Sequence, residues 1–392
     1  MSEASAHKLS LIVEATRGIT PATPRFRRLP DTRTTLALSK ETLASERLTG
    51  NRFPAEPRTG ASTVAGDIPV DLSYGTYDEL IASALQGAWV DGTAGEDSAD
   101  FDGTFGAGAV VGDEHSTTNG AVEIERIDAK AEEVDLIYTA AGVKTNFAIT
   151  KDQNSVVIDG VTFEVDDFTD VENTATVKAG DDRKSFSVLR EFSDMTGDKF
   201  LLLSGLEVAT WSLTASANAI AKSTFTFFGR KQEGPDASAP TGTSYAPALD
   251  TEPFDTFSGS LKIDGVSKCI VTDYSLTVNN GHTARYAVGC AESDDPSVAQ
   301  SVIEGSITAY FEDMSLYKKF IDEEKMSLEL TLADSNGNKL VVKLPNLRLT
   351  SGTQPDVSGD GPITIPINFT AHKDDALDSH ISVTSVSPTA SS

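Results

Sequence analysis

Two similar strand–helix segments in one chain are the sequence feature that most restricts the possible folds. The stretch "VAGDIPVDLSYGTYDELI" covers residues 64–81, and "VIEGSITAYFEDMSLYKKF" covers residues 302–320. In each segment a glycine precedes alternating apolar residues, which predict a strand, and an amphipathic helix follows. The matched positions are Gly66 with Gly305, Ile68 with Ile307, Val70 with Ala309, Leu72 with Phe311 and, after a one-residue shift, Tyr77 with Tyr317 and Leu80 with Phe320.

Two further pairs of segments follow in the same order. "KFLLLSGLEVATWSL" at 199–213 is similar to "KLVVKLPNLRLTSG" at 339–352, and "AIAKSTFTFFG" at 219–229 is similar to "DGPITIPINFTA" at 360–371. Three elements in one order favour an internal duplication. Convergent patterning is the alternative, because short amphipathic matches are common.

The rest of the chain is mainly of β type. Alternating or β-branched runs are separated by Gly, Asn, Asp and Pro, and only the two segments above contain a predicted helix. We therefore expect a mainly β fold with two tandem β-sandwich or barrel modules, each with a short flanking helix. Residues 1–90 and 179–230 form the first predicted module with an N-terminal arm, and residues 251–376 form the second.

Three segments lie outside the predicted modules. Residues 91–178 have no counterpart in the second half, and residues 91–135 carry 13 acidic and 2 basic side chains, a balance of 2 − 13 = −11. We expect an acidic insertion that is partly β. Residues 231–250 are rich in Pro, Gly, Ala and Ser, which is typical of a linker. Residues 377–392 have no periodic pattern and predict a flexible tail.

The net charge of −27 argues against two classes of protein. Proteins that recognise nucleic-acid sequences or bind anionic membranes need clustered Lys and Arg. Passive contact with DNA is still compatible with this net charge, because a surface that repels phosphate would let DNA slide along it. Residues 17–58 are locally basic, with 9 − 4 = +5. A basic arm on an acidic body suggests contacts between copies of the chain, and a solvated loop is the alternative.

The sequence contains no set of residues that predicts catalysis or metal binding. The five histidines are scattered and lack metal-ligand spacing. "EDSADFDG" at 96–103 resembles a calcium loop, but Ala109 stands where such a loop needs a glutamate. We predict no enzyme, no metal and no cofactor. Cys269 and Cys290 lie in β-like stretches and are expected to be buried free thiols.

Targeting signals are also missing from the sequence. The apolar run "LSLIV" ends at Glu14 and is shorter than the core of a secretory signal, and no run is long enough to span a bilayer. We therefore expect synthesis and residence in a cytoplasm.

The repeated strands each carry a second, polar face. In the first copy Asp67, Pro69 and Asp71 alternate with the apolar positions. In the second copy the alternating polar positions are Ser306, Thr308, Tyr310 and Glu312. Such a face usually meets bulk solvent, and the lining of a water-filled channel is the sharper hypothesis.

These segments resemble the tail tube proteins, or major tail proteins, of long-tailed bacteriophages. "VEATRGITPATPRFRRLPDTRTTLALSKETLASERLTGNRF" is similar to the extended arm, strand and loop that open the family, although the S-x-E-x-x loop form is only approximate at residues 45–47. "AGDIPVDLSYGTYDELIASALQGAW" is the most specific match, and "RKSFSVLREFSDM" and "FLLLSGLEVATWSL" also resemble family segments. The resemblance leaves out the insertion at 91–178.

The resemblance implies a structural virion protein with tail-tube-type modules. Copies would form rings that stack into a hollow tail tube, the conduit for genome delivery into the host. The implied partners are further copies, a tape measure protein, tail terminator and distal tail proteins, and double-stranded DNA that passes non-specifically, without membrane insertion. The implied location is the virion tail, after assembly in the host cytoplasm. With two modules per chain, a trimeric ring with pseudo-sixfold symmetry is favoured, and a hexamer is the alternative.

In the family a long hairpin loop and terminal arms reach the next ring. The corresponding loops here would be near residues 47–58 and 290–300. The implied candidates for contacts between rings are Arg25, Arg27, Arg28, Arg47, Arg52, Arg58, Glu292, Asp294 and Asp295. The candidates that would face the lumen are Asp67, Asp71, Thr308 and Glu312.

Two other functions are compatible with the sequence. A β-rich bacterial surface protein or adhesin would be favoured by a signal peptide or by repeated aromatic sugar-binding positions, and the sequence has neither. The inner tube of a contractile injection system shares the fold and would be favoured by a sheath protein encoded nearby.

Overall fold

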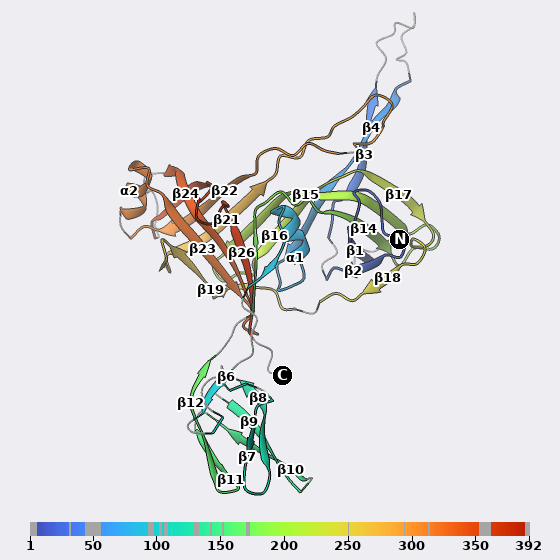
Figure 1. Ribbon diagram of the computed structural model, residues 1–392. Helices are drawn as coiled ribbons and strands as arrows, with labels where there is room; N and C mark the ends of the chain where they lie inside the picture. Colours follow the sequence, from blue (N-terminus) through green and yellow to red (C-terminus); the bar gives the residue numbers. More distant parts are fainter. Residues whose placement is uncertain are drawn as a thin grey trace, which may run out of the picture. The chain divides into compact units, whose positions relative to one another are not determined.

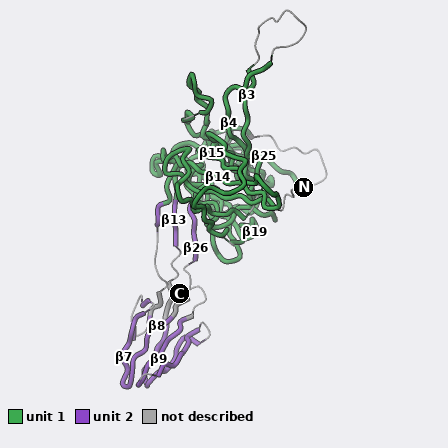
Figure 2. Tube along the Cα trace, turned by 90° about the vertical axis from the view of Figure 1, so that its right-hand side faces the viewer, with its two compact units in different colours: residues 1–89, 177–383 green, residues 90–176, 384–392 purple. Residues whose placement is uncertain are grey.

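The protein is described from a computed structural model of two compact units, which are coloured separately in Figure 2. Unit 1 comprises Met1–Trp89 and Val177–Val383, and unit 2 comprises Val90–Thr176 and Thr384–Ser392. The structure describes residues 6–30, 33–43, 56–92, 98–101, 104–105, 109–110, 112–128, 133–141, 143–150, 153–169, 173–249, 251–293, 295–312, 314–352 and 362–388.

Strands dominate the described residues (Figure 1). The two helices found in them are α1 (Asp78–Ala84) and α2 (Ser315–Ile321). The strands before α1 are β1 (His7–Glu14), β2 (Arg25–Arg28), β3 (Ala37–Leu43) and β4 (Arg58–Asp71). The strands between α1 and residue 178 are β5 (Val90–Asp91), β6 (Ser98–Phe101), β7 (Glu114–Ser116), β8 (Ala121–Asp128), β9 (Glu133–Ala140), β10 (Val143–Ile149), β11 (Ser155–Ile158), β12 (Val161–Thr169) and β13 (Asn173–Lys178). The later strands are β14 (Ser185–Phe192), β15 (Phe200–Ser216), β16 (Lys222–Gly229), β17 (Lys231–Asp236), β18 (Ser244–Ala246), β19 (Asp255–Ile263), β20 (Val266–Ser267), β21 (Val271–Asn279), β22 (Val302–Tyr310), β23 (Met326–Ala333), β24 (Lys339–Gly352), β25 (Thr364–Ala371) and β26 (Ser382–Ser387).

Eight strands of unit 1 form one antiparallel series, β3-β4-β16-β15-β21-β22-β25-β24. The long strand β15 takes part in two sheets. Its first part pairs with β14 and β17, and its second part pairs with β16 and β21. Beyond β14 the order continues to β1 and β2, and β18 pairs with β2 in parallel. One strand therefore connects the two layers of the first half.

The two halves of unit 1 repeat one order of strand pairing. The order is β3-β4-β16-β15-β14-β1 in the first half and β21-β22-β25-β24-β23-β19 in the second, with every neighbouring pair antiparallel. A helix follows the second strand of each series, α1 after β4 and α2 after β22. The first half differs in holding the insertion between α1 and β14.

The pairing registers of the two halves also coincide. Two register shifts interrupt β15, one toward β14 and one toward β16, and two shifts interrupt β24 at the corresponding places toward β23 and β25. Because β-bulges mark positions along a strand, they allow residues to be matched by counting. The matched pairs used below are Gly66 with Gly305, Ser39 with Asn279, Thr63 with Val302, Arg183 with Glu323, Ser185 with Lys325, Gly205 with Asn346, Glu207 with Arg348 and Arg230 with His372.

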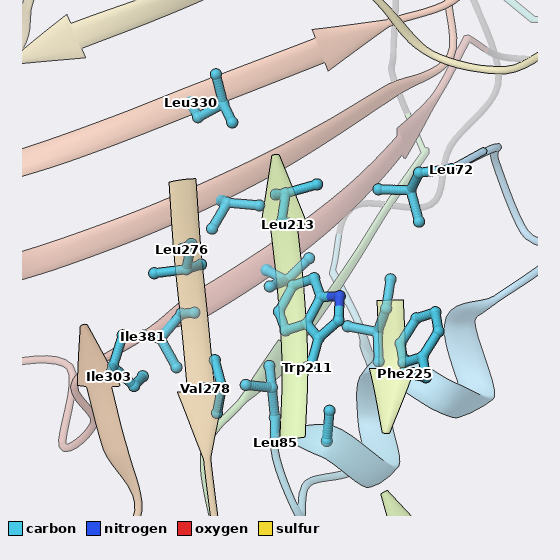
Figure 3. Packing of buried hydrophobic residues seen from close by; sticks show 14 of the residues in the cluster. Leu72, Leu85, Trp211, Leu213, Phe225, Leu276, Val278, Ile303, Leu330 and Ile381 are labelled. Carbon is cyan, nitrogen blue, oxygen red and sulfur yellow. The ribbon is translucent and has the colours of Figure 1, made fainter. Parts of the chain in front are cut away.

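Apolar side chains of both halves share one core (Figure 3). Trp211 of β15 lies at its centre and is 1% exposed. Its ring stacks with Phe225 at a centroid distance of 6.4 Å, and its Nε1 donates a hydrogen bond to Ser223 Oγ at 2.7 Å. Leu276 and Val278 of β21 are buried in the same cluster. A buried indole whose N–H has a partner contributes apolar area without an unsatisfied donor.

The helix α1 covers part of this core. Its buried side includes Leu80 and Ile81, at the spacing that the sequence predicted. Trp89 Nε1 donates to the Asp78 carbonyl oxygen at 2.9 Å, and the buried Asn280 Nδ2 donates to the Ala84 carbonyl oxygen at 2.8 Å. The last bond satisfies a carbonyl at the helix end, where no partner exists within the helix itself.

Unit 2 is a small β structure with its own core. The strands β7, β8, β9 and β10 form a four-stranded antiparallel sheet, and β6, β12 and β11 form a three-stranded sheet. Val122 and Leu136 of the first sheet and Phe163 of the second are fully buried in one cluster. Two sheets that share an apolar core are the arrangement of a β-sandwich.

Three expectations from the sequence differ from the structure. The predicted linker at 231–250 contains β17 and β18, because both find backbone partners in β15 and β2. The predicted flexible tail at 377–392 contains β26, with Val383 and Val386 buried. The prediction of buried cysteines is wrong. Cys269 and Cys290 are both exposed, since neither lies within a strand.

Candidate functional site

The junction between the two halves is a pair of hydrogen-bonded strands. β15 of the first half and β21 of the second are aligned over seven pairs, from Thr210 with Asn279 to Ser216 with Asp273. Both strands also pair on their other sides, β15 with β16 and β21 with β22. The sheets of the two halves are therefore continuous. The same continuity arises when two separate subunits pair their edge strands.

The side of this sheet opposite the core is polar. Residues alternate between the two sides, so one set of positions on six neighbouring strands shares this side. We call this set the polar face. Its members are Asp67, Pro69 and Asp71 of β4; Lys222, Thr224 and Thr226 of β16; Thr210, Ser212 and Thr214 of β15; Asp273, Ser275 and Thr277 of β21; Glu304, Ser306 and Thr308 of β22; and Pro366 and Asn368 of β25.

Hydroxyl groups and carboxylates dominate the polar face. Its charged members are Asp67, Asp71, Asp273, Glu304 and Lys222, a balance of 1 − 4 = −3. Thr226 Oγ1 donates to Asp67 Oδ1 at 2.6 Å, which holds this carboxylate against the sheet. A surface of short polar side chains on which four carboxylates outnumber one lysine repels a polyanion on balance.

A loop of the second half lies on the first half. Residues 280–301 connect β21 to β22 and run beside β4 (Figure 1). The Ser62 amide donates to the Ala291 carbonyl oxygen at 2.7 Å. Arg230 pairs with Glu292 at 3.5 Å, and Arg183 pairs with Asp295 at 3.0 Å. Both ion pairs join a cation of the first half to a carboxylate of this loop.

Glu207 is the centre of this contact. Its carboxylate lies 2.6 Å from Arg17 Nε, 3.0 Å from Arg183 Nη2 and 3.1 Å from His282 Nε2 of the loop. Burial alone would raise the pKa of Glu207, but the hydrogen bond with His282 and the charges of Arg183 and Arg17 outweigh it and lower that pKa. The buried anion is thus stabilised only while its partners remain in place.

Comparison with models of known protein families identifies the family of this chain. The family model described as phage tail tube protein matches residues 4–371, which is nearly the whole chain. The chain belongs to the phage tail tube protein family. A search of curated proteins found no match. Membership of this family supports a role of the chain as a structural component of the phage tail.

In this tail tube protein the described candidates for contacts between rings lie at three places, namely β2, the start of β4 and the 280–301 loop. Arg25, Arg27 and Arg28 lie on β2, where Arg28 stacks on the Tyr245 ring at 4.6 Å. Arg58 begins β4 and is exposed. Glu292 and Asp295 are engaged in the ion pairs with Arg230 and Arg183 described above. Arg47, Arg52 and Asp294 lie outside the described residues.

Three of the four candidates for the lumen lie on one surface of the tail tube protein. Asp67, Asp71 and Thr308 belong to the polar face, and Glu312 follows β22 beyond the last pair. The sequence predictions missed Asp273 and Glu304, which the strand pairs place on the same face. The alternation of polar and apolar residues in "VTDYSLTVN" and "VIEGS" places Asp273 and Glu304 on the polar side of their strands. Only the order of strands in the sheet shows that the two strands are neighbours.

Among the described residues, no group of three or more His, Cys, Asp and Glu side chains could hold a metal ion. In that same part of the tail tube protein, neither helix has the length and apolar character needed to cross a membrane.

Proposed function

We propose that this chain polymerises into stacked rings that form the hollow phage tail tube, the conduit for genome delivery. The junction of β15 with β21 carries the proposal, because it joins two similarly paired halves edge to edge within one chain. The same operation, repeated between chains, would extend the sheet around a ring. Membership of the tail tube family supports this assembly.

In the proposed ring each chain supplies two tandem tube modules, so three chains make a pseudo-sixfold ring. The repeated strand order and the coincident registers support the duplication. In the matched strand orders β24 is equivalent to β15, and β3 is equivalent to β21. Because β15 pairs with β21 within the chain, we expect β24 of one chain to pair with β3 of the next chain in the same way. The matched register aligns Ser351 with Ser39 and Gly352 with Leu38, since Thr210 pairs with Asn279 and Trp211 pairs with Val278.

The polar face would line the lumen of this tube. Its hydroxyl groups and excess carboxylates support the hypothesis, because double-stranded DNA must slide past without being held. Apolar side chains on the other side of the same strands form the core. This orientation explains why a sheet inside a large assembly keeps one polar side.

The proposal includes contacts between rings and with other tail components. The basic arm at Arg25–Arg28 and the arginines of the β3–β4 hairpin would meet the acidic body of the next ring. A tape measure protein would occupy the lumen, and tail terminator and distal tail proteins would bind the two tube ends. Assembly would take place in the host cytoplasm before the tail joins the virion.

Electron microscopy of the purified full-length chain at high concentration tests the proposal. Hollow tubes with six lobes in end-on averages, together with a mass of three chains for a single ring, are expected. Six lobes with a mass of six chains would keep the tube function and overturn the trimer. Monomers under all concentrations and in the presence of tail initiation components would overturn the tube function itself.

A further inference from the structure

Among the described residues, the contact that the 280–301 loop makes with the first half has no counterpart at the equivalent place of the second half. In the first half, Ser185, Gly205, Glu207 and Arg230 surround the site on which the loop lies. Counting along the matched strands leads from these residues to Lys325, Asn346, Arg348 and His372. These four line one cavity of about 330 Å³, which we call the basic pocket.

The basic pocket differs from its counterpart in charge. Lys325 stands where the first half has Ser185, and Arg348 stands where it has the buried Glu207. Lys325, Arg348 and His372 are all exposed. Asn346 Nδ2 donates to the Lys373 carbonyl oxygen at 2.9 Å, whereas its buried Oδ1 receives no hydrogen bond from the described residues. A segment that brings a hydrogen-bond donor to this pocket would satisfy Asn346 Oδ1, and a carboxylate on the same segment would pair with Lys325 and Arg348.

The β3–β4 hairpin has the length of a segment that could occupy the basic pocket of another copy. Ser39 is matched with Asn279 and Thr63 with Val302, so 23 residues of the hairpin correspond to 22 residues of the 280–301 loop. Glu56 lies seven residues before Thr63, and Asp295 lies seven residues before Val302. Glu56 thus corresponds to Asp295, which lies at the first-half site together with Ser185 and Glu207, the residues matched by Lys325 and Arg348. Because Glu323 stands where the first half has Arg183, the cations available to Glu56 are Lys325 and Arg348.

We propose that the β3–β4 hairpin of one copy docks on the basic pocket of the adjoining copy in the ring, with Glu56 facing Lys325 and Arg348. This inference rests on the proposed tube function and specifies the partner surface on the neighbour. Within one chain, the 280–301 loop is the template for that contact. Glu56 of the hairpin binds the neighbour in the same ring, and the arginines of the hairpin remain the candidates for contacts with the next ring.

Site-directed cross-linking tests the contact. Cysteines are introduced as Glu56→Cys and Lys325→Cys in a chain that carries Cys269→Ser and Cys290→Ser, because both natural cysteines are exposed. Assembled tubes are treated with a short thiol-specific cross-linker and separated under denaturing conditions. Dimers and trimers of the chain are expected, and each single-cysteine chain should remain monomeric. Tubes of the double-cysteine chain without cross-linked species would overturn the docking and leave the tube function intact.

Charge exchange provides an independent measurement. Arg348→Glu and Glu56→Arg should each reduce tube yield at least tenfold, and the two together should restore it. Lys343→Glu, an equal change of charge on an exposed residue of β24 outside the pocket, should leave the yield unchanged. Circular dichroism verifies that the variants fold. Normal tubes from folded Arg348→Glu would overturn the docking, whereas absence of tubes from the unaltered chain would overturn the proposed function.

Discussion

Arg183 and Glu207 form an ion pair in the first half, and Glu323 and Arg348 form the matching pair in the second half with the charges exchanged. The nitrogen–oxygen distances are 3.0 Å and 3.9 Å. The first pair is covered by the 280–301 loop, and the second is exposed. Two halves with opposite charges at equivalent places do not offer the same partner surface. The exchange would favour one order of halves around a ring and penalise the other.

Glu207→Gln should destabilise unit 1 by about 3 kcal/mol at neutral pH, because a buried charge network loses its anion. Burial raises the pKa of Glu207, but His282, Arg183 and Arg17 together lower it. The stabilisation is therefore present above the unfolded pKa and is lost as pH falls through the lower folded pKa. Urea unfolding followed by tryptophan fluorescence measures it, since Trp89 and Trp211 both lie in unit 1. Glu233→Gln, on an exposed pair, should change stability by less than about 0.5 kcal/mol. Equal losses of stability in Glu207→Gln and Glu233→Gln would contradict the stabilising role of the buried network around Glu207.

Asp78→Asn should stabilise the protein at neutral pH. Burial and the neighbouring Glu79 raise the pKa of Asp78 to about 6, although Arg27 acts in the opposite direction. The folded state binds this proton more tightly than the unfolded state, so stability falls as pH rises from about 4 to about 6. The variant removes that penalty, by at most about 3 kcal/mol. Thermal unfolding at several pH values should show the two proteins converging near pH 4, and a constant difference at all pH values would refute the explanation.

Gly305→Ala should destabilise unit 1 by about 1 to 3 kcal/mol or prevent its folding. A Cβ at this position would lie 2.3 Å from the Ser275 carbonyl oxygen and 2.4 Å from the Phe369 ring. The matched Gly66 is equally restricted, because its Cβ would lie 2.6 Å from Leu36 Cα. Glu304→Ala, at an exposed residue on the polar side of the same strand, is the control and should change stability by less than about 0.5 kcal/mol. An unchanged melting temperature for Gly305→Ala would show that the strands can separate without cost.

Tubes that carry Asp273→Lys and Glu304→Lys should assemble normally and bind double-stranded DNA at low salt. The two substitutions reverse the charge of the polar face, on which phosphate would then find cations. Retention of DNA by sedimented tubes measures the effect, which should weaken steeply with salt. Glu114→Lys and Glu125→Lys, the same change on exposed residues of unit 2, control for total charge. Equal DNA binding by both variants would place the polar face outside the lumen.

Local patterns predicted much of the fold. Alternation of apolar residues identified β4, β22 and their polar sides, and the helical spacing of Leu80 and Ile81 identified α1. The match of Gly66 with Gly305 agrees with the strand registers, because a glycine is needed where two strands pass too closely for a Cβ. The linker and the tail were predicted from composition. Composition cannot indicate that a Pro- and Gly-rich segment finds free backbone partners on a neighbouring strand.

The sequence by itself determined the strand–helix repeat, the β character and the excess of acidic residues, since each depends on residue type and local spacing. Only the tertiary structure decided that β15 pairs with β21, that the 280–301 loop lies on Glu207, and that Arg348 takes the place of this glutamate. These relations join residues far apart in the chain. They depend on strand order and register, which backbone hydrogen bonds establish across the sheet and which no local pattern encodes.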